Sequence, residues 1–196
     1  MTRVNNEYQR RLTVLRAAVF IDGGYLAMTL KSLGEPRIDY SRLARWAVDG
    51  CDLFRTYYYD CLPYHGYRPS DEERRRAQSK QSFITALNRL DRFTIRLGRL
   101  ALRGKDDHGA PIFDQKRVDL MLGLDIATIV STGKVDLVAL VAGDGDLIPA
   151  VRKAKEEGAL VRLVHGPRLT YDQDLWHEAD ERRELNAGVF ADMPLE

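Results

Sequence analysis

The segment from Lys134 to Val164 limits the possible folds of this chain more than any other part of the sequence. Residues 136–141 are a largely apolar run of strand length, rich in β-branched side chains. Residues 147–154 then place apolar side chains at helical spacing, and Gly158 is suited to end that helix. A second apolar run follows at residues 159–164. This order of strand, helix and strand predicts one unit of a parallel sheet, and therefore an α/β fold.

The turn between the first strand of this unit and its helix contains two carboxylates, Asp144 and Asp146, separated by a glycine. Glycine-rich turns that bind phosphate present bare backbone N–H groups, and two acids there would repel an anion. Oxygen ligands in a flexible turn instead favour a divalent cation such as Mg²⁺ or Mn²⁺. The alternative is structural: Asp144 caps the helix and Asp146 only occupies its first turn.

Two further acids occupy comparable positions. The apolar strand predicted at residues 17–21 ends at Asp22, which is either a site residue or the N-cap of the next helix. The helix predicted within residues 113–130 has Asp119 in the first turn of an otherwise apolar inward stripe. A carboxylate there is costly unless it is paired or bound to a metal ion. Asp119 is therefore more informative than a surface acid.

Asp60 and Asp125 are secondary candidates. Asp60 follows the strand predicted at residues 53–59, and Asp125 is rotated away from the inward stripe by about a third of a turn. A role for Asp125 in hydrogen bonding within the fold explains it equally well.

Basic residues provide candidates for phosphate binding. The helix predicted at residues 71–90 has one basic face, which either contacts phosphates or is simply solvated; its members include Arg74, Arg75 and Lys80. Lys116 precedes the Asp119 helix and is placed either to meet substrate phosphate or to balance the acids. We further predict a strand at residues 93–102 with a bulge at Gly98, and a closing helix at residues 175–185.

Composition adds a few limits. The net charge of +1 neither requires nor excludes a nucleic-acid partner. The two cysteines, Cys51 and Cys61, have neither redox-motif nor zinc-site spacing, and we interpret them as reduced thiols of a cytoplasmic protein. The longest apolar runs are too short to span a membrane, so no membrane association is expected.

The four principal acids, Asp22, Asp119, Asp144 and Asp146, would meet at one edge of a parallel sheet if the strands ending at Asp22 and Asp144 are neighbours. Without a cation the cluster repels itself, by about 1–4 kcal/mol for each pair of charges 4 Å apart. Bound metal ions turn this net repulsion into net attraction, and they can activate water and stabilise a leaving oxygen. Because no Ser, Cys or His nucleophile arrangement competes, phosphodiester hydrolysis is the expected reaction.

Three motifs, AVFIDGGYL, QKRVDLMLGLD and VALVAGDGDLIPAVRKAKEEG, resemble in this order the NYN domain family, the LabA-like branch of the PIN-like nucleases. The resemblance implies a Rossmann-like PIN fold with a central, mostly parallel sheet flanked by helices. It also implies Mg²⁺- or Mn²⁺-dependent ribonuclease activity on single-stranded or structured RNA. The family's metal-site acids correspond to the same four aspartates. Many members carry Asn where Tyr25 stands, and Ser where Gly145 stands, so Tyr25 is a candidate substrate contact that departs from the pattern.

These observations predict an N-terminal arm at residues 1–16, a nuclease domain at 17–186 and a C-terminal tail at 187–196. The oligomeric state stays open, with a homo-oligomer as an alternative to a monomer. Two other functions remain open: an RNA-binding or regulatory NYN module with little or no catalysis, and a haloacid-dehalogenase-like phosphatase. The phosphatase needs a second acid two residues after its nucleophilic Asp, and Gly24 stands there.

Overall fold

One seven-stranded sheet forms the centre of the molecule, with strand order β4-β3-β2-β1-β5-β6-β7. The computed structural model describes residues 14–63, 69–105 and 111–195. The strands are β1 (Arg16–Asp22), β2 (Asp52–Leu62), β3 (Phe93–Lys105), β4 (Pro111–Lys116), β5 (Leu137–Val141), β6 (Leu160–His165) and β7 (Glu181–Glu184). The helices are α2 (Gly23–Ser32), α3 (Tyr40–Ala47), α4 (Asp71–Leu87), α5 (Val118–Ser131), η1 (Gly145–Leu147), α6 (Ile148–Glu156), α7 (Gln173–Glu178) and α8 (Ala187–Ala191).

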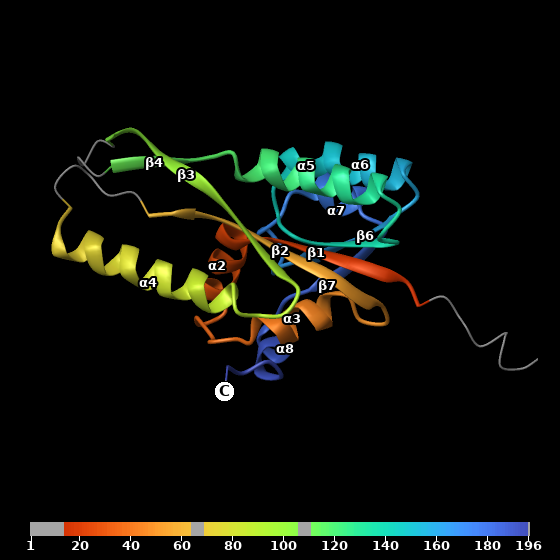
Figure 1. The fold of residues 1–196 in the computed structure, drawn as a ribbon, viewed down its shortest axis with the longest axis horizontal. Helices are drawn as coiled ribbons and strands as arrows, with labels where there is room; N and C mark the ends of the chain where they lie inside the picture. The colour runs from red at the N-terminus through yellow and green to blue at the C-terminus, as the bar shows by residue number, and fades with distance from the viewer. Residues whose placement is uncertain (1–13, 64–68, 106–110, 196) are drawn as a thin grey trace, which may run out of the picture.

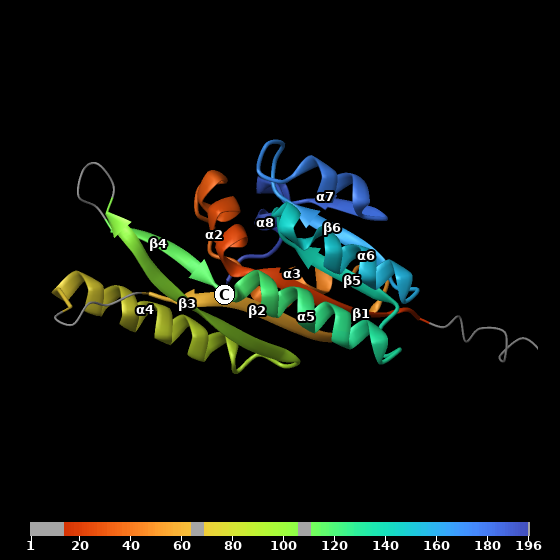
Figure 2. The same cartoon turned by 90° about the horizontal axis from the view of Figure 1, so that it is seen from above.

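Neighbouring strands are parallel throughout, except that β4 runs antiparallel to β3 at one edge. This confirms the predicted α/β fold with a mostly parallel sheet. Helices cover both faces: α5, α6 and α7 lie on one, and α2, α3, α4 and α8 on the other (Figures 1 and 2). Alternate residues of the central strand β1 belong to two separate apolar cores, with Val19 in one and Phe20 in the other. Burial on both faces explains why β1 and β5 are almost entirely apolar.

The strand–helix–strand unit predicted at residues 134–164 is confirmed as β5, η1, α6 and β6. Gly158 has φ +85°, a left-handed conformation that glycine adopts at little cost, and its N–H donates to the Lys155 carbonyl at 2.9 Å. The strand β1 pairs directly with β5. The condition for bringing Asp22 and Asp144 to adjacent strand ends is therefore met.

The region before α5 differs from the prediction. Residues 111–116 form the strand β4, and the helix begins only at Val118. Arg117 has φ +79°, which breaks the chain direction between the two elements. The bulge predicted at Gly98 is also wrong: β2 and β3 pair without a break there, and the register shift lies between Leu102 and Gly104. Both errors concern β3, whose pairing with β2 and β4 the local pattern of its own residues does not specify.

The predicted closing helix at residues 175–185 is replaced by the short helix α7 and the edge strand β7. Ala179 has extended backbone angles, and the Asp180 carboxylate then accepts a hydrogen bond of 2.8 Å from the Val161 N–H. The Asp180 N–H in turn donates to the Val161 carbonyl at 2.9 Å. The free edge of β6 thus captures a segment whose local sequence favours helix.

The C-terminal segment predicted as a tail is part of the domain. Phe190 on α8 and Met193 are buried in the core below the sheet. The Met193 carbonyl accepts a hydrogen bond of 2.9 Å from Asp39 N–H. At the other terminus β1 already begins at Arg16, and residues 1–13 of the predicted arm lie outside the described part of the chain. None of the helices described here combines the length and apolar composition needed to cross a membrane.

Candidate active site

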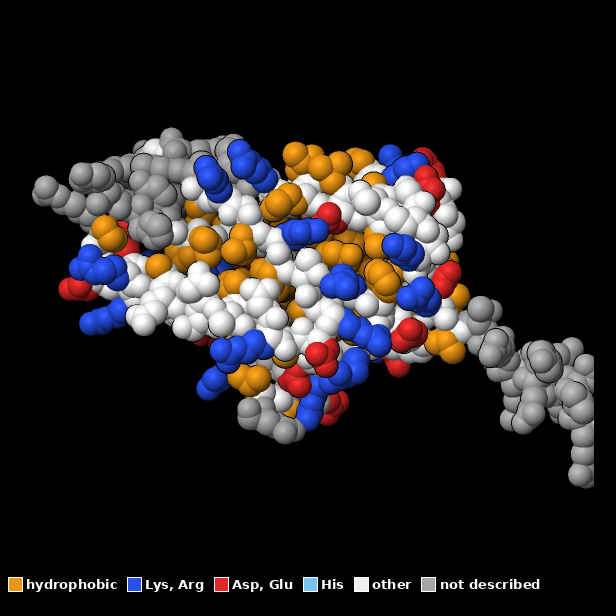
Figure 3. All heavy atoms as spheres, viewed as in Figure 1, with side chains coloured by type: hydrophobic (Ala, Val, Ile, Leu, Met, Phe, Trp, Pro, Cys, Tyr) orange, Lys and Arg blue, Asp and Glu red, His pale blue; other side chains and the backbone are white. Residues whose placement is uncertain are grey.

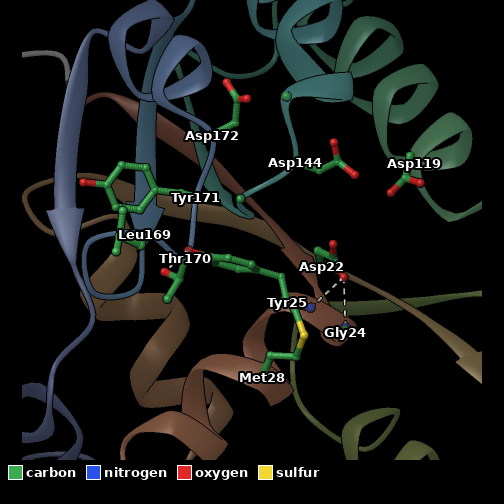
Figure 4. Close-up of a pocket in the computed structure, with 12 residues that line it drawn as sticks. Asp22, Gly24, Tyr25, Met28, Asp119, Asp144, Leu169, Thr170, Tyr171 and Asp172 are labelled. Carbon is green, nitrogen blue, oxygen red and sulfur yellow. Dashed lines mark hydrogen bonds between the residues drawn. The ribbon is translucent and has the colours of Figure 1, made fainter.

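A cavity of about 730 Å³ lies at the carboxyl ends of β1 and β5. Asp22, Asp119 and Asp144 all line it, each from a different element: the end of β1, the first turn of α5 and the turn after β5 (Figure 4). Asp22 and Asp144 are 122 positions apart in the sequence, yet the parallel sheet brings them together. Three of the four predicted aspartates therefore share one cavity.

Asp22 both caps a helix and faces the cavity. Its Oδ1 accepts hydrogen bonds from the N–H groups of Gly24, at 2.9 Å, and Tyr25, at 3.1 Å, which makes it the N-cap of α2 (Figure 4). Oδ2 accepts no hydrogen bond from the described residues. One oxygen thus fixes the carboxylate, and the other is left for a cation. The two roles considered for Asp22 are compatible.

Asp144 repeats this arrangement. Its Oδ1 accepts a hydrogen bond of 2.9 Å from the Asp146 N–H and so caps η1. Within the described part of the chain Oδ2 has no hydrogen-bond donor. Asp144 is exposed to the cavity, whereas the apolar strand that precedes it is buried. The turn therefore presents one carboxylate oxygen in a defined direction.

Asp119 lies beside the buried stripe of α5 rather than on it. The stripe consists of Val118, Leu122, Ile126 and Val130, and Asp119 itself is half-buried at its edge. This corrects the expectation of an inward-facing acid, and it explains how Asp119 can reach the cavity. The same residue also lines a second, largely apolar groove of about 520 Å³ between α5 and α6.

The charges of these acids interact. Burial raises the pKa of Asp22 above its ordinary value, and the charges of Asp119 and Asp60 raise it further. The pKa of Asp119 is also raised, by burial first and then by the charges of Asp144 and Asp146. Two backbone N–H groups oppose the shift at Asp22. Mutual repulsion of this kind is characteristic of a site that is completed by cations.

The raised pKa values, which burial causes first and repulsion between the acids second, have a measurable effect on stability. A carboxyl whose pKa is raised by folding binds more protons in the folded than in the unfolded state, so stability falls as pH rises through that interval and stays reduced at neutral pH. We therefore expect Asp119→Asn to raise Tm in EDTA at pH 7 by roughly 1–3 °C. The difference in Tm between Asp119→Asn and the unaltered protein should become smaller as the pH is lowered toward 4.5. Calorimetry of Asp119→Asn beside the exposed control Asp91→Asn measures this, and an equal Tm for both variants would contradict it.

The donor set suits Mg²⁺ or Mn²⁺, because all three side chains offer carboxylate oxygens. In the described part of the chain, however, no three His, Cys, Asp or Glu side chains come close enough together to hold a metal ion. The acids surround the cavity but do not close on a single point. Small rotations of side chains that have one free oxygen each would be needed for joint coordination.

The other predicted acids have different environments. Asp146 is exposed and lines the apolar groove beside Asp119 rather than the cavity. Asp60 is only 5% exposed and is bound by Lys80, by the Tyr58 hydroxyl at 2.9 Å and by the Cys61 N–H at 2.7 Å. Its oxygens are thus committed to the protein.

Asp125 is a structural residue. It accepts a hydrogen bond of 2.8 Å from the Tyr59 hydroxyl and pairs with Arg96 at 3.1 Å. Of the two roles considered for it, hydrogen bonding within the fold is the one the contacts support.

Sequence reasoning missed Asp172, which also lines the cavity. Its Oδ1 accepts hydrogen bonds from Asp174 N–H at 2.8 Å and Leu175 N–H at 2.9 Å, so it caps α7. A Cβ atom on Gly145 would lie 2.9 Å from the Asp172 carboxyl carbon. The absence of a side chain at Gly145 therefore makes room for this acid. An aspartate directly before a helical pattern was the available signal.

Tyr25 connects α2 to the loop after β6. Its hydroxyl accepts a hydrogen bond of 2.8 Å from Gly166 N–H and lies 3.3 Å from the Thr170 hydroxyl. A Cβ atom on Gly143 would come within 2.3 Å of the Tyr25 ring, so the glycine allows the turn after β5 to pass this close. Tyr25 is 5% exposed, and it positions the cavity wall more than it offers a free surface.

The basic candidates lie on α4 and before α5. Arg74 pairs with Asp71 at 2.6 Å, whereas Arg75 is exposed and forms no ion pair with any described residue. Lys80 is held by buried Asp60. Lys116 is the last residue of β4. Figure 3 shows basic side chains at the end of the molecule where α4 begins and others spread over the same face.

Comparison with known proteins places this geometry in a family. The sequence profile of the NYN domain matches residues 16–184, which includes every strand of the sheet. The chain belongs to the NYN domain family. NYN domains are part of the PIN-like superfamily, whose members are generally nucleases that use divalent metal ions. The resemblance drawn from the three sequence motifs is thereby confirmed.

A crystal structure of a protein of unknown function from Vibrio parahaemolyticus has the same fold as this NYN domain. The two superpose with a TM-score of 0.64 and 21% identity, over 90% of this chain and 96% of the other. No curated protein matches the chain significantly. The solved structure therefore supports the fold, and the family supports a nuclease-like protein.

Proposed function

We propose that this NYN domain is a metal-dependent ribonuclease that hydrolyses RNA phosphodiester bonds. The observation that carries the proposal is the single cavity lined by Asp22, Asp119 and Asp144 from three separate elements. An uncompensated group of carboxylates at the carboxyl edge of a parallel sheet has little purpose without a cation. Asp146 and Asp172 flank this group and would complete the negative field.

In the proposed site, Asp22, Asp119 and Asp144 would hold Mg²⁺ or Mn²⁺. Such ions lower the pKa of bound water and stabilise charge on a phosphoryl group. The capping hydrogen bonds at Asp22 and Asp144 fix one oxygen of each carboxylate, so little side-chain freedom is lost on metal binding. Among the described residues no Ser, Cys or His lines the cavity, and the Thr170 hydroxyl there donates to the Pro167 carbonyl, so water is the proposed attacking group.

The direct test is incubation of the purified protein with end-labelled single-stranded RNA in Mn²⁺, in Mg²⁺ and in EDTA. We expect cleavage with either metal and none in EDTA. Undiminished cleavage in EDTA would reject the metal site. Steady release of phosphate from small phosphomonoesters without RNA cleavage would instead support a phosphatase.

RNA binding should also involve the exposed arginines at the start of α4. We expect Arg74→Ala with Arg75→Ala to weaken RNA binding at 100 mM salt by about threefold to tenfold and to reduce the slope of log K against log salt by about 1–2. Fluorescence anisotropy at several salt concentrations measures both quantities. Arg45→Ala with Arg89→Ala, at the opposite end of the sheet, is the charge-matched control. An unaltered slope in the α4 variant would remove this helix from the interface.

A second candidate function is an RNA-binding module without catalysis. It is favoured by the spacing of the acids, since no three of the described metal-ligating side chains are close enough to hold an ion. Metal-independent RNA binding with no cleavage under any of the conditions above would support it. RNA as the partner, and a cytoplasmic location, are part of both proposals.

A further inference from the structure

The cavity has two chemically different walls. The acids Asp22, Asp119 and Asp144 lie on one side, and the opposite side is formed by Met28 on α2 and by residues 169–171 of the loop after β6 (Figure 4). The acidic wall accounts for the proposed metal ions and for the phosphate that they would bind. The other wall has no role in that chemistry.

Two large apolar side chains of this wall are exposed. Met28 is 67% and Leu169 is 88% exposed. A single apolar residue on a surface needs no explanation, but here two of them line one cavity from different elements. Together they form an apolar rim of the cavity, whereas the ring of the half-buried Tyr171 points away from the carboxylates (Figure 4).

Leu169 is held in this place at a cost. Its φ is +76°, a left-handed conformation that leucine adopts rarely and glycine adopts freely. The loop around it is fixed: Thr170 N–H donates to the Pro167 carbonyl at 3.1 Å, and Asp172 N–H donates to the Gly143 carbonyl at 2.8 Å. A strained residue in a loop that is fixed on both sides is typical of functional sites.

The remaining contacts make the wall rigid. The Tyr171 ring packs against the buried His165 ring, with centroids 4.5 Å apart. The Tyr25 hydroxyl accepts a hydrogen bond from Gly166 N–H and lies next to the Thr170 hydroxyl, so α2 and the loop are fastened together. Met28 and Leu169 are therefore presented by a preformed frame, and a ligand would not have to order it.

From this geometry, and on the basis of the ribonuclease activity proposed above, we propose that the apolar wall is a nucleobase-binding subsite. The phosphate next to the base lies at the acidic wall, and the base packs against Met28 and Leu169. The cavity volume of about 730 Å³ is within the range of small-ligand sites and accommodates one nucleotide. Every base has an apolar face, so the subsite tolerates any sequence.

The subsite has a consequence for the substrate class. A base that is stacked and paired in a duplex cannot enter the cavity, whereas an unpaired base can leave its stack at little cost. The protein should therefore act on single-stranded segments, loops or ends. Backbone phosphates that lack a base should bind poorly.

The test compares adenosine 5′-monophosphate with ribose 5-phosphate, in Mg²⁺, by titration calorimetry and ¹³C-methyl NMR. Neither compound contains a phosphodiester, so binding is measured without turnover. We expect the nucleotide to bind about tenfold more tightly than the sugar phosphate, because its base buries apolar surface against Met28 and Leu169 and the sugar phosphate has no base. The ring current of the base should shift the methyl signals of Met28 and Leu169, which the sugar phosphate leaves unchanged.

The variant Met28→Ala with Leu169→Gly removes the apolar wall and should reduce the preference for the nucleotide to about twofold or less. Leu169→Gly also relieves the left-handed strain, so the fold should be retained, and a melting curve verifies this. Leu195→Ala, an exposed leucine outside the cavity, is the matched control and should keep the full preference. Equal affinities of the unaltered protein for both compounds, no detectable binding of either, or an undiminished preference in the double variant would overturn the subsite.

These outcomes are separate from those of the cleavage assay. A base-dependent affinity in a protein that never cleaves RNA would retain the subsite and reject the nuclease. Metal-dependent cleavage without any preference for the nucleotide would do the reverse.

Discussion

Replacement of Asp144 by Asn is expected to reduce RNA cleavage by on the order of a thousandfold, because a metal ion at the reacting phosphate contributes several kcal/mol. The asparagine Oδ1 can still accept the hydrogen bond from the Asp146 N–H, so the turn after β5 should keep its shape. The negative charge that faces the cavity is lost. Initial rates on labelled RNA in Mn²⁺, with melting curves for both proteins, measure this effect.

Asp22→Asn should give a loss of similar size for the same reason. Asn is as good an N-cap as Asp, so α2 should remain capped by the bonds that now run from Gly24 and Tyr25 to Asp22. The control is Asp174→Asn, which removes an exposed acid from the first turn of α7 outside the cavity and should leave the rate unchanged. Full activity in both site variants would show that these carboxylates do not hold the metal.

The second large effect concerns stability. Lys80→Met should lower the free energy of unfolding by about 2–4 kcal/mol, because it leaves the charge of buried Asp60 without its counter-ion. The methionine keeps the apolar stem that lies near the Phe83 ring. Tm should therefore fall by roughly 4–15 °C in a chain of this length. Thermal and urea unfolding measure the change.

Arg76→Met is the matched control, since it breaks the pair with Glu72 at an exposed position on the same helix and should cost less than about 0.5 kcal/mol. A double variant of Lys80→Met with Asp60→Asn should recover part of the stability, because the buried charge is then gone. If Lys80→Met and Arg76→Met lower the free energy of unfolding by the same amount, the buried charge of Asp60 does not need Lys80 as its counter-ion. The expected stability effect is why Lys80 is a poor residue for testing RNA binding.

The secondary structure of the central region follows from local sequence. The apolar strands β1 and β5, the turn at Asp144 and the helix that ends near Gly158 are all encoded by residues close together in the chain. Buried parallel strands produce continuous apolar runs, and glycine at the end of a helix marks a left-handed residue. The two edge strands do not follow from local sequence. Residues 111–116 and 181–184 are strands because each pairs with an otherwise unpaired edge of the sheet.

The site residues also fall into those that local sequence predicts and those that tertiary contacts decide. An acid at the end of each of two buried strands predicted Asp22 and Asp144, and their place on a common cavity required only that β1 and β5 be neighbours. Asp60 has an equivalent place in the sequence, yet its oxygens are bound by Lys80, Tyr58 and its own neighbour. Local sequence does not distinguish these two cases, because the difference lies in contacts with a helix twenty residues away.

The amino-acid sequence alone determined the α/β class, the NYN family motifs and the acids at the strand ends, since periodicity and residue type are local properties. The tertiary structure decided which acids share a cavity, that Asp172 joins them, and that Met28 and Leu169 form an apolar wall opposite. Those features depend on strand order and on the path of the loop after β6. Strand order and loop path are set by packing between segments far apart in the chain, and local sequence patterns do not predict such packing.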